Sequence, residues 1–146
     1  MIYIKDNVLS DDDIKKLELF YTYPSQQYDQ SIVVAIPSNY EIVQKVKNEV
    51  NNTFEQFNEV DWSQIISYPT GSSKSFHIDD VSEATTGTSV TFLNDDIVGG
   101  EAIVEGVSIT PIKGRTYFID GRMYKHSVSN VIKGTRLTLT SWYKKD

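Results

Sequence analysis

Two stretches in the first 60 residues repeat apolar side chains at helical spacing. The first follows Ser10 and Asp13, a variant of the capping box within an acidic run, and it predicts a short amphipathic helix. The second predicts a longer helix over 39–59, with Ser38 and Glu41 as its capping box. The apolar positions are Ile14, Leu17, Phe20 and Tyr21 in the first stretch and Ile42, Val46, Val50, Phe54 and Phe57 in the second.

Near residue 60 the pattern changes from helical to strand-like. Pro24 and Pro37 bracket an extended stretch between the two helices. After Trp62, short apolar runs are separated by glycines, which is typical of strands joined by tight turns. The predicted strands are 63–68, 74–79, 87–93, 101–105, 107–112, 115–119, 126–132 and 135–143. This series favours a barrel or sandwich of the jelly-roll kind, with the two helices covering one outer face of a sheet.

The composition indicates a single folded unit. A chain of 146 residues, 39% of them hydrophobic and 17 aromatic (9 Tyr, 6 Phe and 2 Trp), can bury a real core. We expect one domain over 1–146, with helical support over 1–60 and a β-rich core over 61–146. The absence of cysteine excludes disulfides, thiol catalysis, zinc–thiolate sites and iron–sulfur clusters. With no signal peptide and no apolar run near the ~20 residues of a membrane span, we expect a cytoplasmic protein without a membrane partner.

Charge is divided unevenly along the chain. Residues 1–112 hold 6 basic and 18 acidic side chains, a net charge of −12, whereas residues 113–146 hold 8 basic and 2 acidic, a net charge of +6. A net acidic protein is a poor general binder of nucleic acid, so nucleic acid is not an expected partner. The basic segment either serves a local anionic ligand or decorates the solvent face of strands, which is the commoner case.

The two histidines of the chain are candidates for a metal site. Alternate side chains of a strand point to one face, so His77 and Asp79 share a face, while Ile78 and Asp80 point away. A jelly-roll can bring His126, 49 residues later, beside that pair. Two imidazoles and one carboxylate make the facial triad of non-haem Fe(II) oxygenases. The pattern alone is weak, because a histidine on a strand is more often a packed or a surface residue.

Ten residues after His126, Arg136 stands on the next predicted strand and shares a strand face with Thr138 and Thr140. A guanidinium on an inward face needs an anionic partner. A dicarboxylate cosubstrate would supply one, and arginine is suited to bidentate capture of a carboxylate. The alternative is a cross-strand ion pair with one of the many acidic side chains.

Several motifs from 62 to the C-terminus occur together in the order that one family shows. These are Tyr68-Pro69-x-Gly71, His77-x-Asp79, Phe92-Leu93-Asn94 followed by Gly99-Gly100-Glu101, Pro111-x-Lys113-Gly114-Arg115 with Phe118, His126, and Arg136 through Trp142-Tyr143. In this combination, the chain resembles the prolyl-4-hydroxylase-like family of Fe(II)/2-oxoglutarate-dependent dioxygenases. The family fold is a double-stranded β-helix, a distorted jelly-roll, which agrees with the strands predicted above.

The resemblance implies a site and a chemistry. It implies the iron ligands His77, Asp79 and His126 and a 2-oxoglutarate site made by Arg136, Tyr68 and Thr140. The expected cofactors are Fe(II), 2-oxoglutarate as cosubstrate, dioxygen and, in addition, ascorbate. The implied reaction couples oxidative decarboxylation of 2-oxoglutarate to hydroxylation of a C–H bond, with release of succinate and carbon dioxide.

Two positions depart from the family pattern. Some relatives have a tyrosine at the position of Phe92, and its hydroxyl helps to hold the cosubstrate carboxylate. Peptidyl-prolyl members often carry an aromatic residue where Lys74 stands. Lys74 either attracts an acidic substrate or points to solvent, and we favour solvent. Trp142 is a candidate for the substrate side or for core packing, and Tyr124 and Arg122 lie either at the pocket mouth or in a plain turn.

Three functions fit the sequence. The first is hydroxylation of a protein or peptide side chain, with proline as the leading guess. The second is a related oxygenase that acts on a nucleobase or a small molecule, for which the acidic first 112 residues are unfavourable. The third is a jelly-roll that binds metal or ligand without turnover, against which the full set of His77, Asp79, His126 and Arg136 argues.

Overall fold

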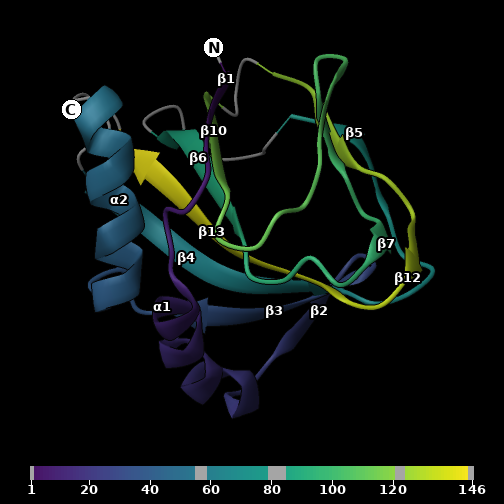
Figure 1. Ribbon diagram of the computed structural model, residues 1–146, viewed down its shortest axis with the longest axis horizontal. Coiled ribbons are helices and arrows are strands. Elements are labelled where there is room, and N and C mark those ends of the chain that lie inside the picture. The colour runs from purple at the N-terminus through teal and green to yellow at the C-terminus, as the bar shows by residue number, and fades with distance from the viewer. Residues whose placement is uncertain (1, 55–58, 79–84, 121–123, 145–146) are drawn as a thin grey trace.

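A computed structural model describes residues 2–54, 59–78, 85–120 and 124–144 (Figure 1). From the N-terminus the elements are β1 (Ile2–Lys5), α1 (Asp11–Lys16), the 3-10 helix η1 (Glu18–Thr22), β2 (Gln26–Tyr28), β3 (Ser31–Ile36), α2 (Glu41–Thr53), β4 (Glu59–Tyr68), β5 (Lys74–His77), β6 (Thr85–Phe92), β7 (Val98–Gly99), β8 (Ala102–Val104), β9 (Val107–Ile109), β10 (Thr116–Asp120), β11 (His126–Val128), β12 (Val131–Lys133) and β13 (Arg136–Lys144).

The described strands form two main antiparallel sheets. The larger sheet has the order β1-β10-β6-β13-β4-β3-β2, and the smaller has the order β5-β11-β8-β9, while β7 pairs separately with β12. From β4 onward the chain passes back and forth between the two sheets, which is the winding of a double-stranded β-helix. The sequence predicted this fold, and each predicted strand has a counterpart in β4, β5, β6, β8, β9, β10, β11 or β13. The predicted strand 126–132 is interrupted, because β11 pairs with β5 and β8 and β12 pairs with β7.

The first 60 residues contribute strands as well as helices. β3 pairs with β4, β2 pairs with β3, and β1 pairs with β10, so these strands extend both edges of the larger sheet. The sequence pattern indicated only an extended stretch between Pro24 and Pro37. Strand formation there depends on the exposed edge of β4, whose backbone groups need partners.

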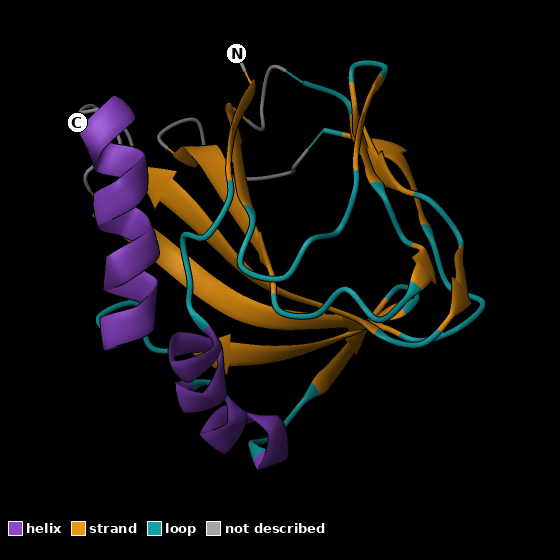
Figure 2. Cartoon of the chain, in the orientation of Figure 1, coloured by secondary structure: helices purple, strands orange, loops and turns teal. Residues whose placement is uncertain are grey.

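The helices cover the outer face of the larger sheet, as the sequence predicted (Figure 2). α2 buries Ile42, Val43, Val46 and Val50 on one side. These side chains join a core cluster that includes Leu139 from β13 and further apolar residues of β3 and β4. The larger sheet therefore has one face against the helices and one face toward the smaller sheet, where the site lies.

Only one of the two predicted capping boxes forms. Ser10 caps α1, since its hydroxyl accepts from the Asp13 amide (3.1 Å) and the Asp13 carboxylate accepts from the Ser10 amide (3.0 Å). The predicted box of Ser38 and Glu41 is wrong, because α2 begins after Tyr40 with no side-chain cap. The Ser38 hydroxyl instead donates to the backbone carbonyl of Asp61 on β4 (3.4 Å). α2 ends at Thr53 rather than at 59, and Phe57 lies outside the described residues.

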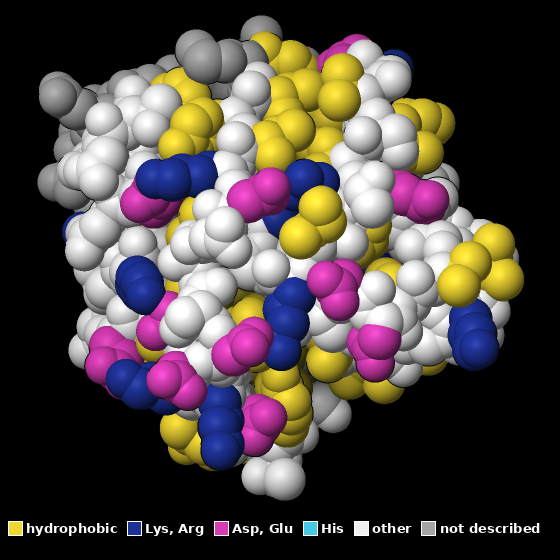
Figure 3. All heavy atoms as spheres, viewed as in Figure 1, with side chains coloured by type: hydrophobic (Ala, Val, Ile, Leu, Met, Phe, Trp, Pro, Cys, Tyr) yellow, Lys and Arg dark blue, Asp and Glu magenta, His cyan; other side chains and the backbone are white. Residues whose placement is uncertain are grey.

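Acidic and basic side chains are interspersed over the face shown in Figure 3. Several salt bridges join the basic C-terminal segment to the acidic remainder of the chain. They are Arg115 with Asp6 (2.6 Å), Lys113 with Asp11 (3.0 Å) and Lys144 with Asp61 (3.5 Å). The uneven division of charge along the sequence is thus partly balanced in space. Within the described ranges, no helix is both long and apolar enough to cross a membrane.

The Ser10 cap supports the first prediction. Ser10→Ala removes the acceptor for the Asp13 amide and should lower the free energy of unfolding by about 1 kcal/mol. Ser10→Asp keeps an acceptor at this position and should leave the stability close to that of the unchanged protein. Chemical denaturation of the three proteins measures the difference, and an equal loss in both variants would contradict the capping role.

Candidate active site

The two histidines of the chain lie side by side on neighbouring strands of the smaller sheet. His77, the last residue of β5, is the direct cross-strand partner of His126, the first residue of β11. The centres of the two imidazole rings are 4.2 Å apart and the ring planes are inclined by 56°. The fold therefore brings the two predicted histidine ligands together across 49 residues of sequence.

Each histidine ring is oriented by a hydrogen bond to the backbone two residues earlier. Nδ1 of His77 lies 2.8 Å from the carbonyl oxygen of Ser75, and Nδ1 of His126 lies 3.0 Å from that of Tyr124. A neutral imidazole that donates through Nδ1 carries its lone pair on Nε2. Metal-binding histidines are commonly held in this way, since the second hydrogen bond fixes the tautomer and the ring orientation. The donor set fits a divalent metal ion.

The predicted third ligand, Asp79, lies outside the described residues, as does Asp80. The described residues alone hold no group of three metal-ligating side chains. β5 ends at His77, so strand alternation does not determine the direction of Ile78. Ile78 lines a cavity together with His77.

A small cavity of about 80 Å³ connects the histidines with Arg136 on β13. Arg136, Thr138 and Thr140 all line it, as predicted from strand alternation, and Leu137 and Leu139 face the helices. Tyr68 on β4, the cross-strand partner of Arg136, also lines it. Its lining residues are Ile66, Tyr68, His77, Thr88, Val90, Tyr117, His126, Val128, Arg136, Thr138, Thr140 and Trp142.

Arg136 is a buried cation, with only 2% of its surface exposed. Its Nε donates to the backbone carbonyl of Gly100 (2.8 Å), and its guanidinium carbon lies 5.5 Å and 5.3 Å from the ring centres of Tyr68 and Phe92. Burial lowers the pKa of Arg136, while Tyr117 opposes this change, partly through a hydrogen bond. None of the salt bridges between described residues involves Arg136, so the alternative of a cross-strand ion pair has no support there.

Gly100, from the Gly-Gly-Glu motif, allows the backbone to approach Arg136. Its φ is +71°, a conformation that favours glycine, and an added Cβ would lie 3.2 Å from Cδ of Arg136. The carbonyl that accepts from the guanidinium therefore belongs to a residue without a side chain. The Gly100 carbonyl holds Nε of the buried guanidinium, and this arrangement fits an anionic ligand in the cavity.

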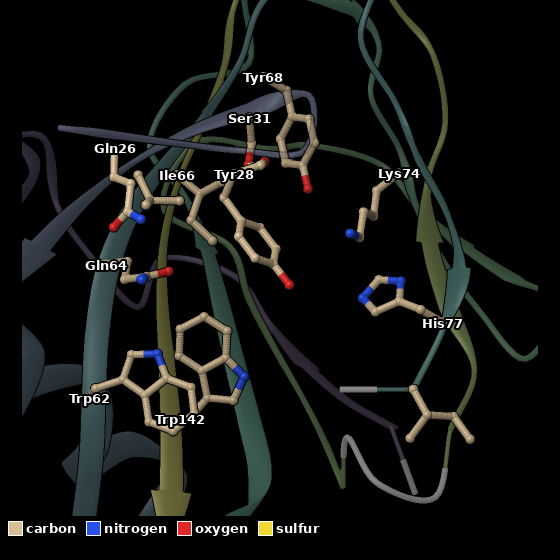
Figure 4. Close-up of a pocket in the computed structure, with 12 residues that line it drawn as sticks. Gln26, Tyr28, Ser31, Trp62, Gln64, Ile66, Tyr68, Lys74, His77 and Trp142 are labelled. Atoms are coloured by element: carbon tan, nitrogen blue, oxygen red, sulfur yellow. The ribbon is translucent and has the colours of Figure 1, made fainter. Parts of the chain in front are cut away.

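A larger cavity of about 510 Å³ adjoins the small one (Figure 4). Trp62 on β4 and Trp142 on β13 stack in it, with ring centres 4.6 Å apart and planes inclined by 18°. Trp142, His77, Tyr68 and Ile66 line both cavities. The larger cavity thus reaches His77, and the stacked indoles form part of its wall.

Lys74 lies in the larger cavity rather than in solvent, which corrects the sequence-based preference. Its side chain is 20% exposed, and its ammonium lies 3.1 Å from the carboxylate of Asp29 and 5.2 Å from the ring centre of Tyr28. The turn between β2 and β3 supplies Asp29 as a counter-charge that the sequence did not reveal. This partner neutralises Lys74, so the interpretation of Lys74 as a general attractor for acidic substrates loses support.

The remaining candidates for the substrate side contribute less. Tyr124 packs beside the core cluster between the sheets and lines neither cavity, although its carbonyl accepts from His126. Arg122 lies outside the described residues.

Three residues of the site were missed from the sequence. Tyr28 depended on the unforeseen β2–β3 hairpin. Trp62 would have been found from the register of β4 against β13, in which it pairs with Trp142. Tyr117 precedes Phe118, which faces the helices, so strand alternation alone places Tyr117 toward the small cavity.

The comparisons with known proteins agree with this fold. The model of the 2OG-Fe(II) oxygenase superfamily matches residues 63–144. A prolyl-4-hydroxylase from Pseudomonas putida shares 16% identity at a TM-score of 0.79, covering 99% of this chain and 92% of its own. The viral collagen prolyl hydroxylase of Paramecium Bursaria Chlorella virus-1, solved with 2OG, shares 18% identity at a TM-score of 0.80, covering 99% and 96%.

A third similar structure is a prolyl hydroxylase from Trichoplax adhaerens in complex with a hypoxia inducible factor oxygen degradation domain peptide fragment. It shares 17% identity at a TM-score of 0.77, covering 99% of this chain and 83% of its own. No curated protein matches the chain.

The chain belongs to the 2OG-Fe(II) oxygenase superfamily. The predicted family, fold and class of enzyme are confirmed. Fe(II), 2-oxoglutarate and dioxygen follow from membership of the family. Ascorbate and the cytoplasmic location stay predictions.

The histidine pair supports a prediction about metal affinity. Loss of a residue that only hydrogen-bonds to a metal ligand weakens metal binding roughly 10- to 100-fold. His77→Ala and His126→Ala each remove an imidazole that would bind the metal directly, so each should weaken Mn(II) binding by a larger factor. Titration followed by electron paramagnetic resonance measures the affinity. Phe76→Ala is the matched control, since this neighbour is 62% exposed and lines neither cavity. Unchanged affinity in either histidine variant would contradict the metal site.

Proposed function

We propose that the protein hydroxylates a C–H bond in a protein or peptide side chain, with a prolyl residue as the leading substrate. The reaction converts 2-oxoglutarate and dioxygen into succinate and carbon dioxide. One observation carries this proposal: the histidine pair and the buried Arg136 share one small cavity, and that cavity adjoins a larger one with aromatic walls.

In this proposal, His77, His126 and Asp79 hold the metal ion. Bound Fe(II), together with 2-oxoglutarate and dioxygen, supplies the oxidising power for C–H hydroxylation. The positions of His77 and His126 as cross-strand neighbours, each with Nδ1 bonded to backbone, support their share of the assignment.

Arg136 binds the distal carboxylate of 2-oxoglutarate, with Tyr68 and Thr140 beside it. A buried guanidinium without a carboxylate partner among the described salt bridges favours an anion at this position. Burial raises the pKa of Tyr68, while Arg136 and Lys74 oppose this change, so the phenol stays neutral near pH 7 and keeps a proton to donate. Thr140 and Thr138, whose hydroxyl oxygens are 3.2 Å apart, add polar groups to the same wall.

Apolar side chains on the remaining walls restrict water. Ile66, Val90 and Val128 line the small cavity together with Arg136 and the two histidines. An enclosure of this kind strengthens the interaction between a guanidinium and a carboxylate, because the local dielectric is lower than that of water.

The larger cavity binds the substrate in this proposal. The stacked indoles of Trp62 and Trp142 provide a flat apolar surface for a ring or an aliphatic side chain, and His77 stands across the cavity from them (Figure 4). Gln26 and Gln64 offer amide groups for a peptide backbone. The three similar structures are all prolyl hydroxylases by their titles, and one of them holds a peptide fragment.

A nucleic-acid substrate is less well supported. Salt bridges to acidic side chains engage Lys113, Arg115 and Lys144. These three basic residues line neither cavity. Around the larger cavity, the ammonium of Lys74 is matched by Asp29.

The direct test is turnover on peptides. With Fe(II), 2-oxoglutarate and dioxygen, proline-containing peptides should gain one oxygen atom by mass spectrometry and form succinate in equal amount. Matched peptides with alanine in place of proline should not react. Metal binding without succinate from any substrate would instead favour a binding module without turnover, and oxidation of the alanine peptides alone would contradict the prolyl assignment.

The indole stack supports a separate prediction about substrate affinity. Trp62→Ala removes one partner of the stack from the larger cavity and should raise KM for a peptide substrate about 3- to 10-fold. Because Trp62 does not line the small cavity, the Kd for 2-oxoglutarate should not change. Steady-state kinetics and calorimetry measure the two quantities. A variant with weaker 2-oxoglutarate binding and unaltered KM for the peptide would reverse the assignment of the two cavities.

A further inference from the structure

One of the aromatic rings against the Arg136 guanidinium, that of Phe92, has no hydroxyl. Phe92 lies over the guanidinium of Arg136 at 5.3 Å and is fully buried. The family that the chain resembles includes members with tyrosine at this position, whose hydroxyl helps to hold the carboxylate. A phenylalanine ring cannot donate a hydrogen bond, so Phe92 presents only an apolar surface to the guanidinium.

A hydroxyl reaches the same place from the neighbouring strand. Tyr117 on β10 is the cross-strand partner of Val90, which shares its strand face with Phe92. The rings of Phe92 and Tyr117 have centres 5.9 Å apart. Tyr117 is 4% exposed and lines the small cavity together with Arg136 and both histidines.

Tyr117 and Arg136 line the same cavity, and a hydrogen bond from the guanidinium to the Tyr117 hydroxyl opposes the lowering of the Arg136 pKa by burial. A guanidinium has only donors, so the phenolic oxygen is the acceptor. A phenol that accepts from a cation can still donate its own proton, and a bound anion is the partner that gains from such a donor. A carboxylate bound by Arg136 can therefore contact both groups.

We propose that Tyr117 is a second anchor for the distal carboxylate of 2-oxoglutarate and replaces, from β10, the hydroxyl that Phe92 lacks on β6. This inference rests on the proposed function. It makes Tyr117 a specificity-determining residue, because its hydroxyl distinguishes an acid with a distal carboxylate from one without it.

Binding to the Mn(II)-loaded protein without oxygen tests the inference independently of turnover. Isothermal titration compares 2-oxoglutarate with 2-oxopentanoate, which has the same chain length and keto acid group but no distal carboxylate. Tyr117→Phe should weaken 2-oxoglutarate binding about tenfold, the effect of losing a hydrogen bond to a charged group. The affinity for 2-oxopentanoate should stay within about twofold of its original value.

A swap variant supplies the control. Phe92→Tyr combined with Tyr117→Phe returns one hydroxyl to the cavity from the other strand and should recover most of the preference for 2-oxoglutarate. Circular dichroism melting checks that each variant folds. Should Tyr117→Phe alone fail to fold, the swap variant decides, since a retained preference supports the anchor and a lost preference overturns it.

The titrations distinguish a failure of the Tyr117 anchor from a failure of the proposed function. Equal weakening for both acids would indicate a structural role for Tyr117 and overturn the inference, as would unchanged 2-oxoglutarate affinity in Tyr117→Phe. If the unsubstituted protein with Mn(II) binds no 2-oxoglutarate, the proposed function itself fails.

Discussion

The burial of one cation organises this site. Removing a guanidinium from water is costly unless hydrogen bonds and nearby charge or aromatic groups compensate. The described surroundings of Arg136 give it a backbone carbonyl at Gly100, a hydroxyl at Tyr117 and the faces of two aromatic rings, with no salt bridge to a carboxylate. Such a position tolerates a cation but favours an added anion. In the proposed function, a carboxylate of 2-oxoglutarate is that anion, and the histidine pair holds the metal ion at the other end of the same molecule.

One face of β13 packs in the core and the other lines the candidate site. Leu139 on one face joins the cluster under α2, while Thr140 on the other lines the small cavity. Because alternation along a strand is strict, the helix-side packing also fixes the direction of the cavity-side residues. The same holds for β10, where Phe118 packs toward the helices and Tyr117 toward the cavity.

Local regularities of the sequence predicted a jelly-roll, and the family resemblance added the double-stranded β-helix and the residues of the candidate site. Glycine breaks and alternation located the strands, and the faces of His77 and Arg136 followed from their strands. Features that depend on distant pairing were missed. The β2–β3 hairpin forms on the edge of β4, and only that hairpin brings Asp29 to Lys74. The Ser38 cap failed for a similar reason, since its hydroxyl bonds to β4 instead.

We propose that 2-oxoglutarate bridges the histidine-bound metal and Arg136. Anaerobic titration of the metal-free protein with Fe(II) and then 2-oxoglutarate tests it most directly, by the visible charge-transfer band of a chelated keto acid on iron. We predict that the band forms in the unsubstituted protein, is lost in His126→Ala, and in Arg136→Met requires much higher 2-oxoglutarate concentrations. Iron binding without the band, or a band formed at the same 2-oxoglutarate concentration in Arg136→Met, would contradict this claim.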